Sequence, residues 1–445
     1  MTATIELREL QLFVQQCDPN QPLETNDPRY VNLDQGEPVR GDGRSCIDDL
    51  HRTVVLSGAP TCQLFTGFQG TGKTTELHRL RSRLTDEKSV PLHAILIDFE
   101  QYLNPYAAVS ISDVLRVLAY ALDREATSAE GGDPTASPGY LKRLYDFLAR
   151  TDVELQKLGF AQAGATLMLE LKDNPTFRQK IEAALSIRFQ LFAREAQEVI
   201  AEAIVRLRRA THAQQIVVIA DGLEKFQPPR EEDRASVEAS VQTLFVEHAS
   251  WLRLPCHAIY TFPLWLRFRT AELDACYDRE AQILPMVKVS DRQGGPYTPG
   301  FAKLTELVAR RLDVSRVFGA SLEPTLHALI AASGGYPRDL LRMVREVLWQ
   351  SRSFPVAPGE VQRIISRLGE TYARTIRTPD VDILTEVART HELPRGDGAR
   401  LNAFGRLLEK YLVLAYRNGG EWYDLHPLAR RASIVKERLV KEPST

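Results

Sequence analysis

A glycine-rich run that ends in lysine and threonine is the part of this sequence best equipped for chemistry. It reads Gly67-Phe-Gln-Gly-Thr-Gly-Lys73-Thr74, with the G-x-x-x-x-G-K-T spacing of a phosphate-binding loop. Glycines allow successive backbone N–H groups to turn toward phosphate oxygens, and the start of the following helix adds partial positive charge. Lys73 would reach the β and γ phosphates, and the Thr74 hydroxyl would bind Mg²⁺. A glycine-rich turn without a chemical role is the alternative, and it fits the flanking strand and helix less well.

An acidic residue at the end of a later apolar run adds a metal ligand. Residues 215–221 read Gln-Ile-Val-Val-Ile-Ala-Asp, which predicts a buried strand with one carboxylate at its carboxyl end. Asp221 would hold Mg²⁺ opposite Thr74. Glu224, one turn further along, could orient or deprotonate an attacking water. The strand pattern alone is a weak signal, and the phosphate loop upstream strengthens it.

Three more polar residues are candidates for contact with a nucleotide. Thr261 ends a strand-like run and could sense the γ-phosphate, although a hydroxyl bonded within the protein is an equally good interpretation. Arg338 follows Gly334-Gly-Tyr-Pro, in the first turn of a helix, where a positive charge opposes the helix dipole. Arg40 precedes the loop and could contact the base or ribose, or lie in a surface turn.

Alternating strands and helices must position these residues. Apolar runs predict parallel strands around Leu64 and Phe65, and at 92–100, 215–221 and 254–263. Asp98 and Glu100 could lie near the metal, but capping of the next turn is the preferred interpretation. Between the second and third strands, amphipathic patterns predict a helical insertion at about 111–209, with helices at 111–124, 139–150 and 176–209 and a loop over 126–138. Residues 270–300 read as irregular.

The carboxyl-terminal third reads as helices followed by a hairpin. Helices are predicted over 301–312, over 322–332 and from Pro337, and then over 381–390 and 397–411. Asn418-Gly419 between apolar runs predicts a β-hairpin, and helix, helix, hairpin is the outline of a winged helix. The fold class is therefore α/β: a P-loop NTPase parallel sheet with a helical insertion, a helical lid and a C-terminal winged helix. We expect domains at 1–50, 51–290, 291–372 and 373–445.

Composition limits the environment and the partners. The 445 residues have a net charge of −2, so any basic surface must be local. No run of apolar residues approaches the length of a membrane span, and the five scattered cysteines predict neither a zinc site nor a disulfide framework. A cytoplasmic protein without membrane contact is the expectation.

In order, these motifs resemble the AAA+/STAND group of P-loop ATPases, and look closest to STAND-type switches and initiator-type AAA+ proteins. The resemblance covers roughly residues 30–445, apart from the insertion. It implies ATP or ADP with Mg²⁺ as ligands, phosphate contacts from the loop, Mg²⁺ at Asp221 and a second sensor at Arg338. The loop residues concerned are Gly67, Gln69, Gly70, Thr71, Gly72, Lys73, Thr74 and Thr75. Gly222 stands where AAA+ proteins usually have glutamate, and only Arg310 and Arg311 are candidates for an arginine finger.

Two functions follow from this resemblance. The first is a slowly hydrolysing switch ATPase that signals to a separately encoded effector or sensor protein, by analogy in a bacterial defence system, with a homo-oligomer possible. The alternative is a DNA-binding AAA+ loader, initiator or transposition regulator, whose winged helix would grip duplex DNA through Arg417, Arg430 and Arg431. Because the winged helix lacks a basic run, a packing role for it is the preferred interpretation.

Overall fold

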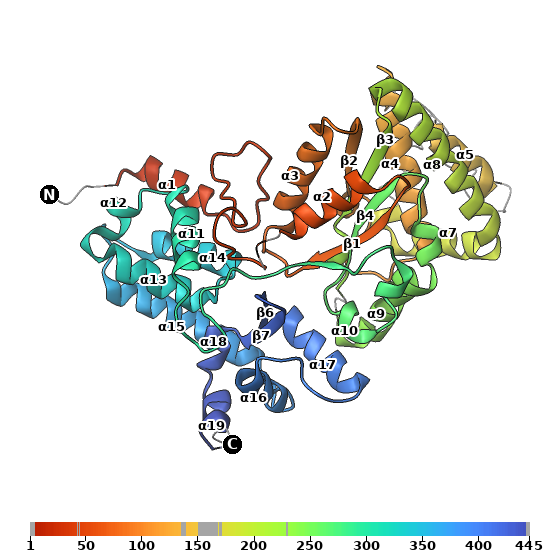
Figure 1. Ribbon diagram of the computed structural model, residues 1–445. Coiled ribbons are helices and arrows are strands. Elements are labelled where there is room, and N and C mark those ends of the chain that lie inside the picture. Colours follow the sequence, from red (N-terminus) through yellow and green to blue (C-terminus); the bar gives the residue numbers. More distant parts are fainter. Residues whose placement is uncertain are drawn as a thin grey trace. The chain divides into compact units, whose positions relative to one another are not determined.

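The computed structural model describes residues 5–41, 43, 45–134, 139–149, 168, 171–227 and 230–441. These residues form two compact units (Figure 1), each built from separate stretches of the chain. The first unit holds residues 1–49, 67–78 and 283–445, and the second holds residues 50–66 and 79–282. The phosphate loop therefore belongs to the first unit, and the strand that ends in Asp221 belongs to the second.

A five-stranded sheet is the framework of the fold, in the order β2-β3-β4-β1-β5. Its strands are β1 (Cys62–Gly67), β2 (Leu92–Asp98), β3 (Gln215–Asp221), β4 (His257–Thr261) and β5 (Gln282–Leu284). The pairs β2–β3, β3–β4 and β1–β4 are parallel. Six consecutive residues of β3 are buried, as expected for a strand covered on both faces. The predicted parallel sheet is confirmed, but the sequence analysis missed β5, whose three residues are too few to show a period.

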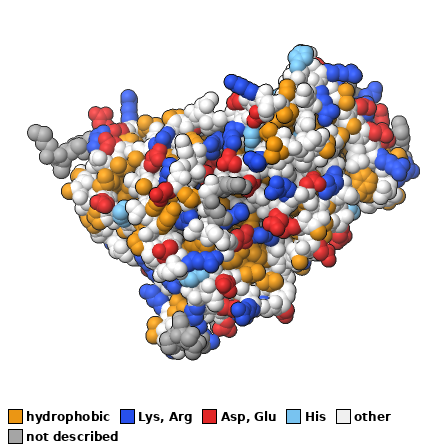
Figure 2. All heavy atoms as spheres, viewed as in Figure 1, with side chains coloured by type: hydrophobic (Ala, Val, Ile, Leu, Met, Phe, Trp, Pro, Cys, Tyr) orange, Lys and Arg blue, Asp and Glu red, His pale blue; other side chains and the backbone are white. Residues whose placement is uncertain are grey.

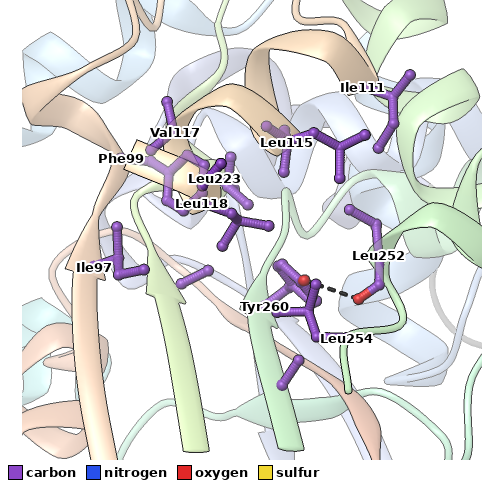
Figure 3. Packing of buried hydrophobic residues seen from close by; sticks show 14 of the residues in the cluster. Ile97, Phe99, Ile111, Leu115, Val117, Leu118, Leu223, Leu252, Leu254 and Tyr260 are labelled. Carbon is purple, nitrogen blue, oxygen red and sulfur yellow. Dashed lines mark hydrogen bonds between the residues drawn. The ribbon is translucent and has the colours of Figure 1, made fainter. Parts of the chain in front are cut away.

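Helices of the insertion pack against this sheet and against one another. Leu115 and Leu118 of α4 (Ile111–Ala129) join the same apolar cluster as Ile97 of β2 and Tyr260 of β4 (Figure 3). The long helix α8 (Phe189–Thr211) packs on both α4 and β3. The buried ridge of α8 recurs every three or four residues, which is the spacing that predicted a helix here.

The insertion differs from its prediction in two places. The single helix expected over 176–209 is two helices, α7 (Pro175–Ile187) and α8, which are separated by Arg188. The apolar spacing continues across Arg188, so the period gave no sign of a break. The predicted loop at 126–138 is helical as far as Ala129, and its residues 135–138 lie outside the described residues. Helix α5 (Gly139–Ala149) follows as expected.

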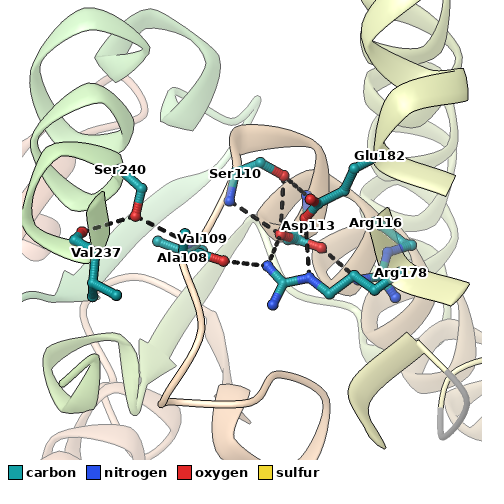
Figure 4. A network of polar contacts seen from close by, with 9 residues as sticks. All are labelled: Ala108, Val109, Ser110, Asp113, Arg116, Arg178, Glu182, Val237 and Ser240. Carbon is teal, nitrogen blue, oxygen red and sulfur yellow. Dashed lines mark hydrogen bonds and ion pairs between the residues drawn. The ribbon is translucent and has the colours of Figure 1, made fainter. Parts of the chain in front are cut away.

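A buried ion network ties α4 to α7 (Figure 4). Ser110 and Asp113 form a reciprocal capping box at the start of α4. Asp113 also pairs with Arg116 at 2.8 Å and with Arg178 of α7 at 2.6 Å. Burial alone would raise the pKa of Asp113, but the two guanidinium groups lower it to about 2. The two helices are therefore joined through a carboxylate that stays charged.

The first unit consists of helices and one hairpin, apart from the phosphate loop. The amino-terminal α1 (Leu7–Gln16) packs on α14 (Pro337–Gln350). The lid helices are α11 (Thr298–Ala309), α12 (Val314–Phe318), α13 (Leu322–Ser333), α14 and α15 (Pro358–Thr375), of which α12 and α15 were not predicted. The winged helix comprises α16 (Asp380–Thr390), α17 (Gly398–Glu409), β6 (Val413–Arg417), β7 (Glu421–Leu425), α18 (Pro427–Arg430) and α19 (Ser433–Lys441). Residues Val413–Arg417 pair antiparallel with Glu421–Leu425, which confirms the hairpin.

Several short elements complete the chain. The remaining α-helices are α2 (Cys46–Leu56), α3 (Lys73–Thr85), α9 (Arg234–Gln242) and α10 (Leu266–Arg269). A π-helix spans Thr243–Glu247, and 3₁₀ turns lie at Phe99–Gln101, Leu223–Lys225, Glu231–Asp233, Ala249–Leu252, Asp274–Cys276 and Gly319–Ser321. None of the helices in the described ranges is long and apolar enough to cross a membrane.

Candidate functional site

The phosphate loop is closed around the side chain of Lys73. This lysine begins α3, is 4% exposed, and donates hydrogen bonds from Nζ to the carbonyls of Gly67 and Phe68, both at 3.1 Å. Gly70 and Gly72 have φ values of +78° and +94°, which side chains other than glycine rarely adopt. A Cβ added to Gly72 would meet no atom within 4 Å, so the loop leaves open space there. The predicted strand, loop and helix are confirmed, with the ammonium group inside the loop.

The threonine hydroxyls of the loop have different surroundings. Thr71 donates its hydroxyl to the Phe68 carbonyl at 2.8 Å, and Thr75 accepts a hydrogen bond from the Leu23 N–H at 3.0 Å. Thr74 lies in the first turn of α3. Thr74 occupies the position of the motif whose hydroxyl is expected to bind Mg²⁺, directly after Lys73.

The amino-terminal segment from Leu23 to Arg40, here called the strap, holds the helix that follows the loop. Besides the Leu23–Thr75 bond, the Thr25 hydroxyl donates to the carbonyl of His78 at 3.2 Å, and the Tyr30 hydroxyl donates to Glu76 at 3.4 Å. The strap thus supports α3 at three successive points of its first turns.

Arg40 also serves the loop rather than the base or ribose. Its guanidinium is 3% exposed, donates to the Thr71 carbonyl at 2.7 Å, and lies 3.8 Å from the carboxylate of Glu76. Both terminal nitrogens therefore face protein oxygens. We had expected Arg40 to contact a nucleotide or lie in a surface turn, and its burial between Thr71 and Glu76 corrects both expectations.

Arg338 lies directly over the loop. It occupies the first turn of α14, as predicted, and a Cβ placed on Gly70 would come within 2.5 Å of its Nε. This Nε is buried without a hydrogen-bond partner, and Arg338 makes no ion pair with any other described residue. Arg338 as a whole is half-buried, and the desolvation cost falls on this one nitrogen. An anion on the loop would supply the missing acceptor.

Two carboxylates gather at the carboxyl end of β3, in the second unit. Asp221 and Glu224 are 4% and 7% exposed, and both accept a hydrogen bond from the N–H of Gly222, at 2.9 and 3.1 Å. Gly222 has φ +91°, and this conformation turns the chain into the 3₁₀ turn that carries Glu224. Glycine at this position therefore brings the second acid back toward the first.

Thr261 holds that same turn. Its hydroxyl donates to the Ala220 carbonyl and accepts from the Leu223 N–H, each at 3.2 Å, and the residue is fully buried. Of the two interpretations drawn from sequence, the structure fits the hydroxyl bonded within the protein. The expectation of a γ-phosphate sensor is corrected, because the hydroxyl proton is already donated and no surface is open.

The other acidic candidates are structural. Asp98 accepts a hydrogen bond from the Glu100 N–H at 3.0 Å and so caps the next turn, as preferred from the sequence. Glu100 pairs with Lys225 at 2.5 Å. Burial tends to lower the pKa of Lys225, but the hydrogen bond that Lys225 donates to Glu100 and the nearby Glu224 and Asp221 raise it overall.

The two candidates for an arginine finger are engaged within the lid. Arg310 pairs with Glu306 at 2.7 Å. Arg311 is 5% exposed and donates to the carbonyls of Arg29 and Leu307. Burial lowers the pKa of Arg311 to about 10. Neither residue presents an unoccupied guanidinium to a neighbouring subunit.

The sequence analysis missed two tyrosines that contact the loop. The Tyr336 hydroxyl donates to the Gln69 carbonyl at 2.6 Å, and Tyr411 stacks on the ring of Tyr336. Tyr336 stands between Gly335 and Pro337, and this position beside the predicted lid turn was the available signal. Nothing in the sequence pattern singled out Tyr411.

No protein-family model matches this chain, and no curated protein matches it either. Three solved structures are similar over most of their length. The ORC1 protein of Aeropyrum pernix in complex with DNA is 14% identical, with 92% of this chain and 96% of that chain covered and a TM-score of 0.36. Drosophila ORC bound to DNA is 14% identical, with coverages of 97% and 91% and a TM-score of 0.36. Cdc6p of Pyrobaculum aerophilum is 11% identical, with coverages of 89% and 92% and a TM-score of 0.32. The switch, effector and defence expectations gain no support from these comparisons.

Proposed function

We propose that this protein binds ATP with Mg²⁺ on the phosphate loop and hydrolyses it. The observation that carries the proposal is the buried Nε of Arg338, which has no acceptor and lies over Gly70 of a loop whose lysine points inward. A chain of phosphates on this loop would give both cations an anionic partner. Adenine is favoured over guanine because the sequence has no Asn/Thr-Lys-x-Asp motif for reading guanine.

The residues available for Mg²⁺ fit a nucleotide-dependent site. We assign the ion to Thr74 and Asp221, since β3 and β1 end at the same edge of the parallel sheet and the loop follows β1 in the chain. Among the described residues, no group of three or more His, Cys, Asp or Glu side chains could hold a metal alone. Phosphate oxygens and water would have to complete the coordination, as is usual for Mg²⁺. The bound ion would neutralise phosphate charge during hydrolysis.

The roles of the remaining groups follow from their surroundings. Glu224 is our candidate for orienting or deprotonating the attacking water. Thr261 is a positioning residue, because it holds the turn that carries Glu224. Arg338 belongs to the lid, so its contact with the nucleotide would link the lid to the phosphate loop and be lost when the γ-phosphate leaves.

Replacing Lys73 with alanine tests the proposal. The wild-type protein should retain ATP or ADP on purification and bind ATP in calorimetry. The Lys73→Ala variant should bind at least about 100-fold more weakly, because it loses charge-assisted contacts to phosphate. Lys180→Ala is the matched control, since Lys180 is an exposed lysine of α7. Equal nucleotide retention by wild type and Lys73→Ala would contradict the proposal.

Duplex DNA is a second candidate ligand, through the winged helix. The tip of the hairpin, Asn418 to Gly420, is exposed, and so are Arg431 and Lys436. Around it the surface is mixed in charge, as Figure 2 shows for one face, where basic and acidic side chains are interspersed. Arg430 is less available because it pairs with Asp424.

A salt series tests the DNA candidate. Affinity for a short duplex should fall linearly in a log–log plot against salt, and Arg431→Ala should weaken binding and reduce the slope by about one. Arg143→Ala, which removes an exposed arginine of the insertion, serves as the control. Absence of binding at low salt would remove DNA from the proposal and leave the ATPase assignment unaffected.

A further inference from the structure

Two tyrosines from different parts of the first unit meet at the tip of the phosphate loop. Tyr336 precedes α14 of the lid, is 1% exposed, and donates its hydroxyl to the Gln69 carbonyl at 2.6 Å. Tyr411 follows α17 of the winged helix and stacks on Tyr336, with ring centroids 5.2 Å apart and planes 22° apart. The Tyr411 ring also lies 6.4 Å from the ring of Phe68, the loop residue before Gln69.

Tyr411 occupies a backbone position that normally belongs to glycine. Helix α17 ends with hydrogen bonds from the Leu412 N–H to the Leu407 carbonyl and from the Tyr411 N–H to the Leu408 carbonyl. This is the Schellman arrangement, in which the residue at Tyr411 takes a left-handed conformation, and its φ is +57°. A bulky side chain is disfavoured there. Its presence indicates that the ring has a use that outweighs the backbone cost.

The hydrogen bond from Tyr336 fixes the orientation of one peptide group. In a trans peptide the C=O and the following N–H point in opposite directions. Because the Gln69 carbonyl is held toward Tyr336, the Gly70 N–H points away from it. Burial raises the pKa of Tyr336 well above its ordinary value, so its hydroxyl remains a donor throughout the physiological range.

The winged helix also holds the lid turn on either side of Tyr336. The Tyr416 hydroxyl of β6 donates to the Gly334 carbonyl at 2.6 Å. Asp339 of α14 accepts from Tyr372 at 2.7 Å and lies 3.4 Å from His426, which is fully buried and stacks on Tyr372. The turn that carries Tyr336 and Arg338 is therefore braced by the winged helix.

We propose that Tyr336 and Tyr411 are positioning residues that aim the Gly70 N–H at the phosphates of the nucleotide, so that affinity depends on the seating of the winged helix. This inference rests on the proposed ATP binding. Tyr336 orients the peptide, and Tyr411 keeps Tyr336 in place by stacking. The winged helix thereby acts on the phosphate loop without touching the nucleotide.

Conservative variants separate the two roles. Tyr336→Phe keeps the ring and loses the hydrogen bond, and should weaken ATP and ADP binding by about threefold to tenfold. Tyr411→Phe keeps the stacking and removes only a long hydrogen bond of 3.4 Å to the Gln69 side chain, so it should weaken binding less than Tyr411→Leu does. Tyr411→Leu loses the stacking and should resemble Tyr336→Phe. Tyr423→Phe is the matched control, because it removes a hydroxyl that donates to Glu421 in the hairpin of the winged helix.

The ATP affinity of the double variant is the decisive measurement. If both residues act through the Gln69–Gly70 peptide, Tyr336→Phe with Tyr411→Leu should bind ATP little worse than either single variant. A raised KM with unchanged kcat is the matching kinetic result, with apo melting temperatures recorded for every variant. Wild-type affinity in Tyr336→Phe, an equal loss in Tyr423→Phe, or additive losses in the double variant would each overturn the inference. Failure of wild type to bind ATP, or equal binding by Lys73→Ala, would instead overturn the proposed function.

Discussion

The backbone amide of Gly222 and the hydroxyl of Thr261 help to fix the position of Glu224. The Gly222 N–H bonds both Glu224 and Asp221, and Thr261 ties the intervening Leu223 to β4. If Glu224 assists the attacking water, Glu224→Gln should lower kcat by about 10²–10⁴-fold while ATP binding is kept. Phosphate release and calorimetry measure the two quantities. Unchanged phosphate release would remove Glu224 from the catalytic machinery, and a wild-type protein with no release would be one that binds ATP without turnover.

Thr261→Val tests the positioning of that turn. The variant loses the hydroxyl and leaves the Ala220 carbonyl and Leu223 N–H without this partner, so stability should fall by about 1–3 kcal/mol and kcat should fall with it. Thr385→Val is the control, since Thr385 is also buried but bonds only the Asp382 carbonyl within α16. It should lose stability without losing turnover. A Thr261→Val protein with a normal kcat would show that the turn is held by other contacts.

For single residues, the sequence predicted the position correctly where neighbouring residues in the chain determine it. Arg338 was placed correctly because Pro337 marks the start of a helix. Arg40 was not, and the two interpretations of Thr261 could not be separated, because the partners of each lie more than 30 residues away in the chain, at Thr71 and Ala220. Burial between distant segments leaves no trace in a single sequence.

At the scale of elements, two carboxyl groups at the contact between α4 and α7 make opposite contributions to the pH dependence of stability. Burial and the charge of Asp113 raise the pKa of Glu182 to about 7, against an ordinary 4.5. A carboxyl whose pKa is raised in the folded state costs stability as pH rises through that window. Asp113 has the opposite sign: its pKa of about 2 means that its contribution is present at neutral pH and is lost as pH falls from about 4 toward 2.

Glu182→Gln should therefore change the pH profile of stability. Compared with wild type, the variant should melt at a higher temperature at pH 8 and at a similar temperature at pH 5. Glu202→Gln, which removes one partner of an exposed pair with Arg143, should leave the profile unchanged. A Glu182→Gln protein that melts lower than wild type at pH 8 would mean that the bond to Arg178 outweighs the cost of the buried charge.

Element boundaries were predictable where burial imposes a period and not elsewhere. The end of β3 was predicted at Asp221, where the apolar run meets the acid, whereas the predicted run over 92–100 extends two residues beyond the end of β2. The break at Arg188 and the π-helix over Thr243–Glu247 change the backbone without changing the apolar spacing. Neither the break nor the π-helix is marked in the sequence by a glycine or a proline.

For the whole molecule, ligand linkage gives the broadest test of nucleotide binding. ATP with Mg²⁺ at about 100 times its Kd should stabilise the folded protein by about 2.7 kcal/mol. The melting temperature should rise by about 5–11 °C, because each 1 kcal/mol shifts the melting temperature of a domain of about 150–250 residues by about 2–4 °C. Lys73→Ala should show no rise, and neither should wild type with ATP and excess EDTA if Mg²⁺ is required. A rise that is equal in Lys73→Ala would place the ligand elsewhere.

The strap extends the part of the chain that supports the phosphate loop beyond the loop motif itself. The consensus motif ends at Thr74, yet the first turns of its helix are tied to Leu23, Thr25 and Tyr30. A shortened chain that begins at Val31 would carry every residue of the motif and lack all three ties. A protein that received only the motif residues would lack the same three hydrogen bonds. Phosphate binding by this loop would thus depend on two stretches of chain, of which only one has a recognisable signature.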